Sequence, residues 1–320
     1  MIPRIGRHFY VQAGRSVVVI REMNVNFQGV LAGVLILGFG TACFAQEEEK
    51  LPVAVTEYFD LAYVDGGDDR QKLDLYIPAR EDKSKKLPLV VWIHGGGWAK
   101  GSRDGTGNCS WVLDEGYALA SIGYRLTDVA PFPAQLDDCK AGIQWLKKNG
   151  AEFGVDADRI VVWGSSAGGH LVAMLGTTGD PEDSGDDIDG VIDWFGPTEL
   201  LTMQEQRTLP VKLDANAPDS YESKLVGGTL QEVPEKAKAA SPVTHVTKDD
   251  APILILHGNQ DPLVPLQQSY TLVKAYDAVE VPAQLVVIEG AGHGGPAFQT
   301  EGARKVMLEF LNKCTAVASD

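Results

Sequence analysis

One junction constrains the fold of this chain more than any other stretch. A β-branched run passes directly into Gly-x-Ser-x-Gly, and the motif passes directly into an apolar helical stretch. The run covers residues 159–163, and the motif covers residues 164–168 with Ser166 at its centre. A strand that meets a helix without a loop forces a sharp turn, so small residues are needed on both sides of it. The turn lifts the Ser166 hydroxyl off the sheet, close to the first N–H groups of the helix. Because such a motif also arises by chance, the rest of the chain has to support this interpretation.

Apolar strand-like runs alternate with helical segments along most of the chain. This alternation predicts an α/β fold, a mostly parallel sheet flanked by helices. The run at 87–93 is continuously apolar, which is typical of a strand covered on both faces. Residues 133–149 carry an apolar stripe at helical spacing. Eight strands are expected, the first ones antiparallel, at residues 56–64, 72–78, 87–93, 117–124, 159–163, 190–196, 253–256 and 284–288.

The stretch 198–250 interrupts this alternation. It is polar, contains several prolines and has no strong strand pattern. We interpret it as an insertion that covers the active-site face rather than as a second domain.

Four chemically capable groups follow predicted strands. They are the turn at 94–97, Ser166, Asp261 and His293. Reactive groups gather at the carboxyl ends of the strands in an open α/β sheet. The order oxyanion loop, Ser, Asp, His is that of α/β hydrolases and differs from the orders of the two common serine protease classes.

Each group has a chemical reason to be there. A serine hydroxyl needs a base within hydrogen-bond reach before it attacks an ester, and His293, flanked by glycines, is the candidate base. Asp261 would hold the imidazole tautomer and stabilise the imidazolium.

The tetrahedral oxyanion needs preorganised donors. We expect these donors to be the backbone N–H groups of Gly96, Gly97 and Ala167.

Other polar residues near these strand ends are interpreted as structural. The acidic pair at 249–250 precedes its strand and so lies at the wrong end of the sheet. We expect His257 to be a structural residue at a strand end and His170 to be buried and hydrogen-bonded. Arg125 is expected to form an ion pair with the acidic residues at 137–138.

Three aromatic residues, Trp98, Tyr124 and Trp194, follow or end strands on the same face. They are candidates for lining an acyl or sugar pocket, and packing in the core or rim is the open alternative.

The first 45 residues differ from the rest. Residues 30–39 are an apolar run, too short to span a bilayer and suited to a signal-peptide core. We expect a signal peptide at 1–45, with Met23 as an alternative start, and therefore export to the periplasm or the extracellular space. Lipid anchoring through Cys43 is a less favoured alternative.

A linker at 46–55 and a catalytic domain at 56–316 complete the expected organisation.

Charge and cysteine content exclude several partners. The net charge of −16 becomes −19 without residues 1–45, which argues against nucleic acid or an anionic membrane surface. No stable membrane insertion is expected after cleavage. Cys109, Cys139 and Cys314 would remain. They have neither metal-site nor disulfide-framework spacing, although one bridge stays open. The sequence does not predict an oligomeric state.

Four segments together resemble a known family. Residues 94–102, 163–171, 261–265 and 290–296 look like the corresponding motifs of α/β-hydrolase carboxylesterases. The branch they resemble most is the bifunctional feruloyl and acetylxylan esterase-like group, which borders on the hormone-sensitive-lipase-like esterases. The resemblance covers roughly residues 56–312.

The resemblance implies a cofactor-free serine esterase with Ser166, Asp261 and His293 as its triad. After Tyr124 the chain continues Arg-Leu-Thr-Asp-Val-Ala-Pro, where hormone-sensitive-lipase-like esterases usually have Ala-Pro-Glu close by. This departure weakens any transfer of their substrate preferences.

The predicted function is that of a secreted serine carboxylic-ester hydrolase acting through an acyl-enzyme. Its expected substrates are short acyl or feruloyl esters of polysaccharide such as acetylxylan. The alternatives are a general short-chain lipolytic carboxylesterase, a prolyl-oligopeptidase-type peptidase and a non-catalytic binding module on the same scaffold.

Overall fold

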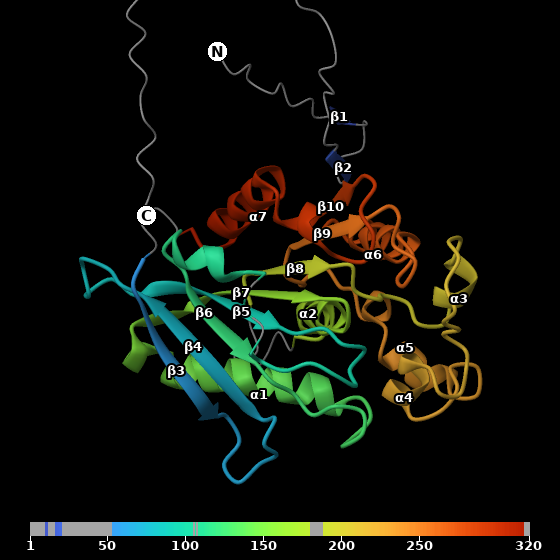
Figure 1. Cartoon of the computed structure of the whole chain (residues 1–320), viewed down its shortest axis with the longest axis horizontal. Coiled ribbons are helices and arrows are strands. Elements are labelled where there is room, and N and C mark those ends of the chain that lie inside the picture. The colour runs from blue at the N-terminus through green and yellow to red at the C-terminus, as the bar shows by residue number, and fades with distance from the viewer. Residues whose placement is uncertain are drawn as a thin grey trace, which may run out of the picture.

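A single sheet runs through the molecule in the strand order β1-β2-β10-β9-β8-β7-β5-β6-β4-β3 (Figure 1). The structure is a computed structural model that describes residues 10–11, 17–20, 53–104, 106, 108–179 and 188–316. Its strands are β1 (Tyr10–Val11), β2 (Val17–Ile20), β3 (Val55–Ala62), β4 (Lys72–Pro78), β5 (Leu87–Ile93), β6 (Ala118–Ile122), β7 (Val155–Ser165), β8 (Gly190–Trp194), β9 (Ile253–Gly258) and β10 (Ala283–Ile288).

Strands β3 to β10 are the eight that the sequence predicts. β4 pairs antiparallel with both β3 and β6, and the remaining pairs from β6 across to β10 are parallel. The antiparallel start is therefore confirmed. The expected total of eight was too low, because the described part of the chain has ten strands in this sheet.

The two additional strands come from the segment predicted to be a signal peptide. β2 pairs in parallel with β10, from Leu285 opposite Val17 to Ile288 opposite Ile20, and β1 pairs with β2. The run Val-Val-Val-Ile has the β-branched composition that a strand favours. Residues 21–52, which include the predicted apolar core and cleavage site, lie outside the described residues. Cleavage near residue 45 stays a prediction, and it would remove both strands.

Helices cover both faces of the sheet. On one face α1 (Ala134–Asn149), α2 (Ala167–Thr177) and α6 (Gln267–Ala278) share a hydrophobic cluster with the strands. On the other face, α7 (Glu301–Cys314) packs in a second cluster together with the 3₁₀ turn at 110–113. Coverage on both sides explains why the central strands are almost wholly apolar.

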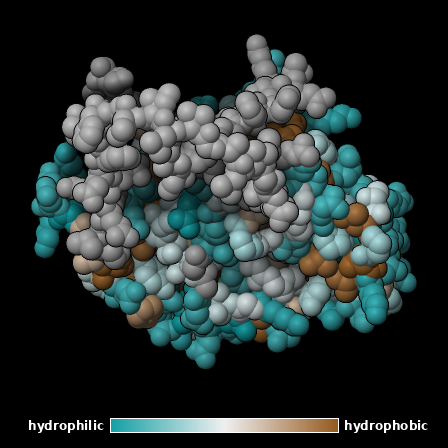
Figure 2. Space-filling view, turned by 45° about the horizontal axis from the view of Figure 1, so that its top comes forward, coloured by the Kyte–Doolittle hydropathy of each residue, from teal (hydrophilic) through white to brown (hydrophobic). Residues whose placement is uncertain are grey.

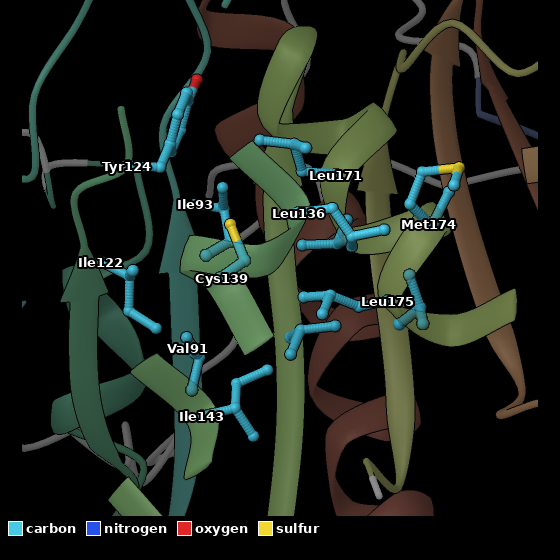
Figure 3. Close-up of a cluster of buried hydrophobic side chains, with 14 of the residues drawn as sticks. Val91, Ile93, Ile122, Tyr124, Leu136, Cys139, Ile143, Leu171, Met174 and Leu175 are labelled. Atoms are coloured by element: carbon cyan, nitrogen blue, oxygen red, sulfur yellow. The ribbon is translucent and has the colours of Figure 1, made fainter. Parts of the chain in front are cut away.

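The stripe predicted on α1 is the part of that helix that meets the sheet. Figure 3 shows Leu136, Cys139 and Ile143 of α1 beside Val91 and Ile93 of β5, and all five side chains are buried. Spacings of three and four residues place successive apolar side chains on one side of a helix, and burial of that side fixes its orientation.

The insertion at 198–250 contains short helices and no strand in the structure. These helices are α3 (Met203–Gln206), α4 (Tyr221–Val226) and α5 (Pro234–Ala239), followed by a 3₁₀ turn at 242–244. Figure 1 shows α3, α4 and α5 grouped on the side toward which the arrows of the central strands point. The insertion thus lies over the carboxyl ends of the strands, as expected.

Outside the area drawn in grey, the described residues on the face in Figure 2 are mostly hydrophilic, with several hydrophobic patches. In the described part of the chain, no helix is long and apolar enough to cross a bilayer. No group of three or more potential metal ligands occurs within those residues either. Cys109, Cys139 and Cys314 are free thiols.

Candidate active site

The strand–turn–helix junction places Ser166 at its tip. β7 ends at Ser165 and α2 begins at Ala167, so Ser166 alone forms the turn, with φ 56° and ψ −118°. A Cβ at Gly164 would collide with the backbone of Gly168. One at Gly168 would collide with the carbonyl of Ile93. These two contacts are the physical reason for both glycines of the motif.

Ser166, His293 and Asp261 form a continuous hydrogen-bonded relay. Ser166 Oγ lies 2.9 Å from His293 Nε2, and His293 Nδ1 lies 2.6 Å from Asp261 Oδ2. Because a carboxylate only accepts hydrogen bonds, Nδ1 carries the imidazole proton and Nε2 is free to accept the serine proton. The structure therefore brings together the three residues predicted from their positions after separate strands.

Asp261 is buried, and several donors hold its carboxylate. The backbone N–H groups of Leu263 and Val264 donate to Oδ1 over 2.8 and 3.0 Å. Burial acts to raise the pKa of Asp261, but hydrogen bonds from His257 and His293 outweigh it and hold the pKa well below the ordinary value. The side chain therefore stays ionised and can stabilise a charged His293.

The loop after β5 lies against the serine turn, where a Cβ at Gly95 would be 3.4 Å from Ser166 Cβ. Gly96 and Gly97 have φ values of 113° and 59°, a region that favours glycine. Both line the same cavity as Ser166 and Ala167. The three residues predicted to hold the oxyanion therefore line the cavity that contains the serine, and their role as donors stays a prediction.

Buried side chains hold this loop in place. Tyr124 donates from its hydroxyl to the carbonyl of His94 over 2.9 Å and stacks on the His94 ring. Burial lowers the pKa of His94 to about 4, so its imidazole is neutral at physiological pH. On the far side of the loop, Trp98 donates to His170 Nδ1 over 3.1 Å.

These contacts correct one prediction and qualify two others. Tyr124 is completely buried and does not line the cavity, because its ring is used to support the oxyanion loop. Its expected place in the substrate pocket is therefore wrong. Trp98 and Trp194 do line the cavity, yet each is only 2% exposed, so they contribute mainly to its packed wall.

A cavity of about 810 Å³ opens above the serine. Its walls come from the oxyanion loop, the serine turn, the His293 loop and the insertion. Phe195, at φ 48°, follows β8 and packs its ring 4.5 Å from the His293 ring. The size suits a small organic substrate.

A family model described as BD-FAE matches residues 73–276, more than half of the chain. The chain belongs to the BD-FAE family. The matched segment contains the oxyanion loop, Ser166, the insertion and Asp261. The predicted fold is confirmed as well, since this member of the BD-FAE family has the mostly parallel sheet with flanking helices of an α/β hydrolase.

Similar proteins include esterases of known sequence and structure. Esterase LipC of Mycobacterium tuberculosis is 34% identical over 242 residues, which cover 72% of this chain and 58% of LipC. The chain spans about half to three fifths of the length of the first curated relatives it matches.

Two solved structures are also similar. A truncated carbohydrate esterase from gut microbiota is 30% identical with a TM-score of 0.72, covering 82% of this chain and 97% of the other. A bifunctional GH43-CE protein of Bacteroides eggerthii is 28% identical with a TM-score of 0.73, covering 81% of this chain and 35% of the other.

The insertion of this BD-FAE family member contributes cavity residues that the sequence did not reveal. Tyr221 lies against Gly97, where a Cβ would be 2.6 Å from the tyrosine ring. Arg207 and Glu222 form an ion pair in the cavity wall, with 3.9 Å between Nη2 and Oε1. These residues follow no motif and no periodic pattern, so only the folded chain brings them to the site.

The residues interpreted as structural behave largely as expected. His170 is fully buried, and its Nε2 lies 2.7 Å from the carbonyl of Ala240. Arg125 forms its ion pair with Asp138, at 2.6 Å. His257 is also fully buried, but it additionally contacts Asp261.

Proposed function

We propose that this chain is a serine carboxylic-ester hydrolase that acts through an acyl-enzyme on short acyl or feruloyl esters of polysaccharide. The observation that carries the proposal is the relay from Ser166 through His293 to the buried Asp261, with contacts of 2.9 and 2.6 Å. Such a relay converts a weakly acidic hydroxyl into a nucleophile.

Acylation uses the relay in one direction. Ser166 Oγ attacks the ester carbonyl carbon while its proton passes to His293 Nε2. The carbonyl oxygen becomes an oxyanion, which the N–H groups of Gly96, Gly97 and Ala167 stabilise. When the tetrahedral intermediate collapses, the bond to the alkoxy oxygen breaks, and His293 gives its proton to that oxygen. The alcohol leaves and the acyl group remains on the serine.

Deacylation repeats the steps with water. A water molecule attacks the acyl carbon as its proton passes to His293 Nε2. The second tetrahedral intermediate collapses, the serine oxygen takes back that proton, and the carboxylic acid leaves. Asp261 stays ionised throughout and balances the imidazolium that forms twice in each cycle.

Several features support small or carbohydrate-borne esters as substrates. The insertion is polar and forms short helices, so it lacks the large apolar lid that long acyl chains favour. The cavity wall includes aromatic rings and a charged pair beside apolar residues such as Met203 and Leu213. Similarity to a solved carbohydrate esterase supports the same substrate class by analogy.

A substrate series tests the proposal. We expect kcat/KM along p-nitrophenyl esters from acetate to laurate to be highest for the shortest acyl chains. Acetylxylan or methyl ferulate should also be hydrolysed, and Ser166→Ala should abolish each activity. A maximum at eight carbons or longer, without release from either carbohydrate-type substrate, would contradict the substrate class. That outcome would favour a general lipolytic carboxylesterase.

We also propose that the protein is exported. The support is the apolar run at 30–39, followed by small residues at 41–45 and an acidic stretch. Export would place the enzyme where polymers too large for import occur. Expression with residues 1–45 should give an exported protein whose N-terminus, read by mass spectrometry, begins near Gln46. A soluble cytosolic protein with an intact N-terminus would refute export.

A further inference from the structure

The insertion places a buried pair of opposite charges in the wall of the cavity above Ser166. Arg207 follows α3, and Glu222 belongs to α4. Their side chains are only 6% and 8% exposed, and both residues line the cavity that contains Ser166 and His293. Burying two charges is costly unless hydrogen bonds compensate each of them, so their partners are informative.

Some N–H groups of the Arg207 guanidinium make no hydrogen bond to the described residues. Its Nη1 donates to Gln204 Oε1 and to the carbonyl of Leu213, over 2.9 and 2.7 Å. Its Nη2 donates to the carbonyl of Leu263 over 3.0 Å. Its Nε is buried without a hydrogen-bond partner among the described residues. Since a guanidinium carries five N–H groups, the Nε proton and the second Nη2 proton have no hydrogen-bond partner among the described residues, and because Nε is fully buried, the Nη2 proton is the one that a ligand could use.

Glu222 is close to these donors but does not satisfy them. Its Oε1 lies 3.9 Å from Arg207 Nη2, which is beyond hydrogen-bond range. Burial raises the pKa of Glu222, and hydrogen bonds from its own backbone N–H and from Ser220, together with the positive charge of Arg207, oppose that rise. The pair therefore presents a donor and an acceptor side by side, with a gap between them.

A hydroxyl group matches this arrangement better than other ligand groups. One oxygen placed off the line between Arg207 and Glu222 can accept from the guanidinium and donate to the carboxylate, with two contacts of about 2.8 Å. A ligand carboxylate would be repelled by Glu222, and an ammonium group by Arg207. An alkyl chain would leave both charges desolvated and unpaired.

We propose that Arg207 and Glu222 form a subsite that binds a hydroxyl group of the substrate. This inference rests on the proposed esterase function and adds the feature by which the enzyme selects among short esters. The hydroxyl has two sources in such substrates: the phenol of an aromatic acyl group, or a sugar ring on the alcohol side.

A structural role for Arg207 accounts for only part of these contacts. Its bond to Leu213 lies within the insertion, and its bond to Leu263 ties the insertion to the loop that carries Asp261. Those bonds use Nη1 and Nη2 and do not involve Glu222. A test must therefore measure selectivity rather than activity alone.

Two matched pairs of esters provide that measurement. Methyl 4-hydroxycinnamate and methyl cinnamate differ only in a phenolic hydroxyl on the acyl side. The 3-acetate of 1,5-anhydroxylitol and 4-acetoxytetrahydropyran differ only in two ring hydroxyls on the alcohol side. We expect kcat/KM of the wild-type enzyme to favour the hydroxylated ester by about 10- to 100-fold in at least one pair, as for a charge-assisted hydrogen bond. The pair that responds identifies the source, and ratios near one in both pairs would overturn the subsite without any variant.

Glu222→Gln keeps the side-chain shape and removes the charge. It should reduce the responding ratio by about tenfold. The matched control is Glu205→Gln, at an exposed position of α3, which makes the same chemical change and should leave the ratio unaltered. A folded Glu222→Gln enzyme with the wild-type ratio would refute the proposal.

Failure of the subsite is distinguishable from failure of the proposed function. An enzyme that hydrolyses p-nitrophenyl acetate and methyl ferulate but shows no hydroxyl preference lacks the subsite only. An enzyme that prefers long acyl chains, or is inactive on every ester, contradicts the proposed function itself.

Discussion

His257 and His293 approach the same carboxylate oxygen of Asp261. The Nε2 atom of His257 lies 3.3 Å from Asp261 Oδ2, which is also 2.6 Å from Nδ1 of His293. The Nε2 atom of His257 is also 2.9 Å from the carbonyl of Val264, an acceptor only, so Nε2 carries a proton. Ser269 Oγ, at 2.6 Å from Nδ1, then donates to that nitrogen. His257 thus positions the aspartate without touching the cavity.

We predict that His257→Phe lowers kcat by about tenfold and leaves KM nearly unchanged, because the carboxylate loses a donor while the cavity walls stay intact. The free energy of unfolding should fall by about 1–3 kcal/mol for each buried polar partner left unsatisfied. Steady-state kinetics and urea denaturation measure the two effects.

Ser269→Ala is the matched control for His257→Phe. It removes the hydrogen bond to Nδ1 and leaves the contacts of Nε2 with Asp261 and Val264 in place. Its kcat should stay within about twofold of wild type, with a stability loss of about 1 kcal/mol. If His257→Phe folds and keeps full kcat, His257 supports the fold alone.

The triad predicts strongly non-additive losses. Ser166→Ala should lower kcat by about 10⁴–10⁶ with folding intact, and His293→Ala should be about as damaging, since nucleophile and base act as one unit. The double variant should be little worse than either single one. Full additivity of the two losses, measured with p-nitrophenyl acetate, would argue against a shared catalytic unit.

Much of this site could be predicted because local chemistry and strand position coincide. The bounds of β4 and β5 match the predicted runs 72–78 and 87–93, since alternation and continuous apolarity are properties of the strands themselves. Ser166, Asp261 and His293 each follow a strand, and the sheet brings such ends together.

The errors have equally physical causes. Tyr124 follows a strand on the expected face, but its ring turns inward onto His94, and no sequence pattern reveals that rotation. The expected strand count omits β2, because Val17–Ile20 lies in the segment interpreted as a leader from the apolar run at 30–39, although its β-branched composition also suits a strand. Arg207 and Glu222 lie fifteen positions apart in an aperiodic insertion, so their pairing depends on the tertiary structure.

The oxyanion loop gives a further prediction. Gly97→Ala adds a methyl group 2.6 Å from the Tyr221 ring, at a φ of 59°. Either the ring or the loop must shift, so we expect kcat to fall by about 10²–10³ with a smaller change in KM, because the N–H donors meet full charge only in the transition state.

Two controls separate the clash from backbone strain. Gly116→Ala has a similarly positive φ but nothing within 4 Å of the new methyl group, so it should reduce stability and leave kcat unaltered. Tyr221→Ala in the Gly97→Ala background removes the clash and should restore part of kcat. A pure KM effect of Gly97→Ala would contradict the assignment of this loop to the oxyanion.

Asp193 is a buried carboxyl group with an unusual titration. It lies in β8 one residue before the strand ends at Trp194. Its Oδ1 accepts from the N–H of Gly196 over 2.8 Å, and its Oδ2 has no partner among the described residues. Burial raises its pKa to about 7, although the hydrogen bond from Gly196 opposes the shift. The unfolded chain releases this proton near pH 3.9. The free energy of unfolding therefore falls as the pH rises from about 4 to about 7.

We therefore predict that Asp193→Asn is more stable than wild type at pH 7.5 and that this advantage disappears toward pH 4. The difference should be on the order of 3–4 kcal/mol at most, from linkage over a shift of about three pKa units. His94 and His170 titrate oppositely, because burial lowers the pKa of each to about 4 and their neutral forms stabilise the fold above pH 6.5. Their contribution is common to both proteins and cancels in the comparison.

Urea denaturation of wild type, Asp193→Asn and the exposed control Asp158→Asn between pH 4 and 8 measures the effect. A stability difference that does not vary with pH would show that Asp193 is already ionised in the folded protein.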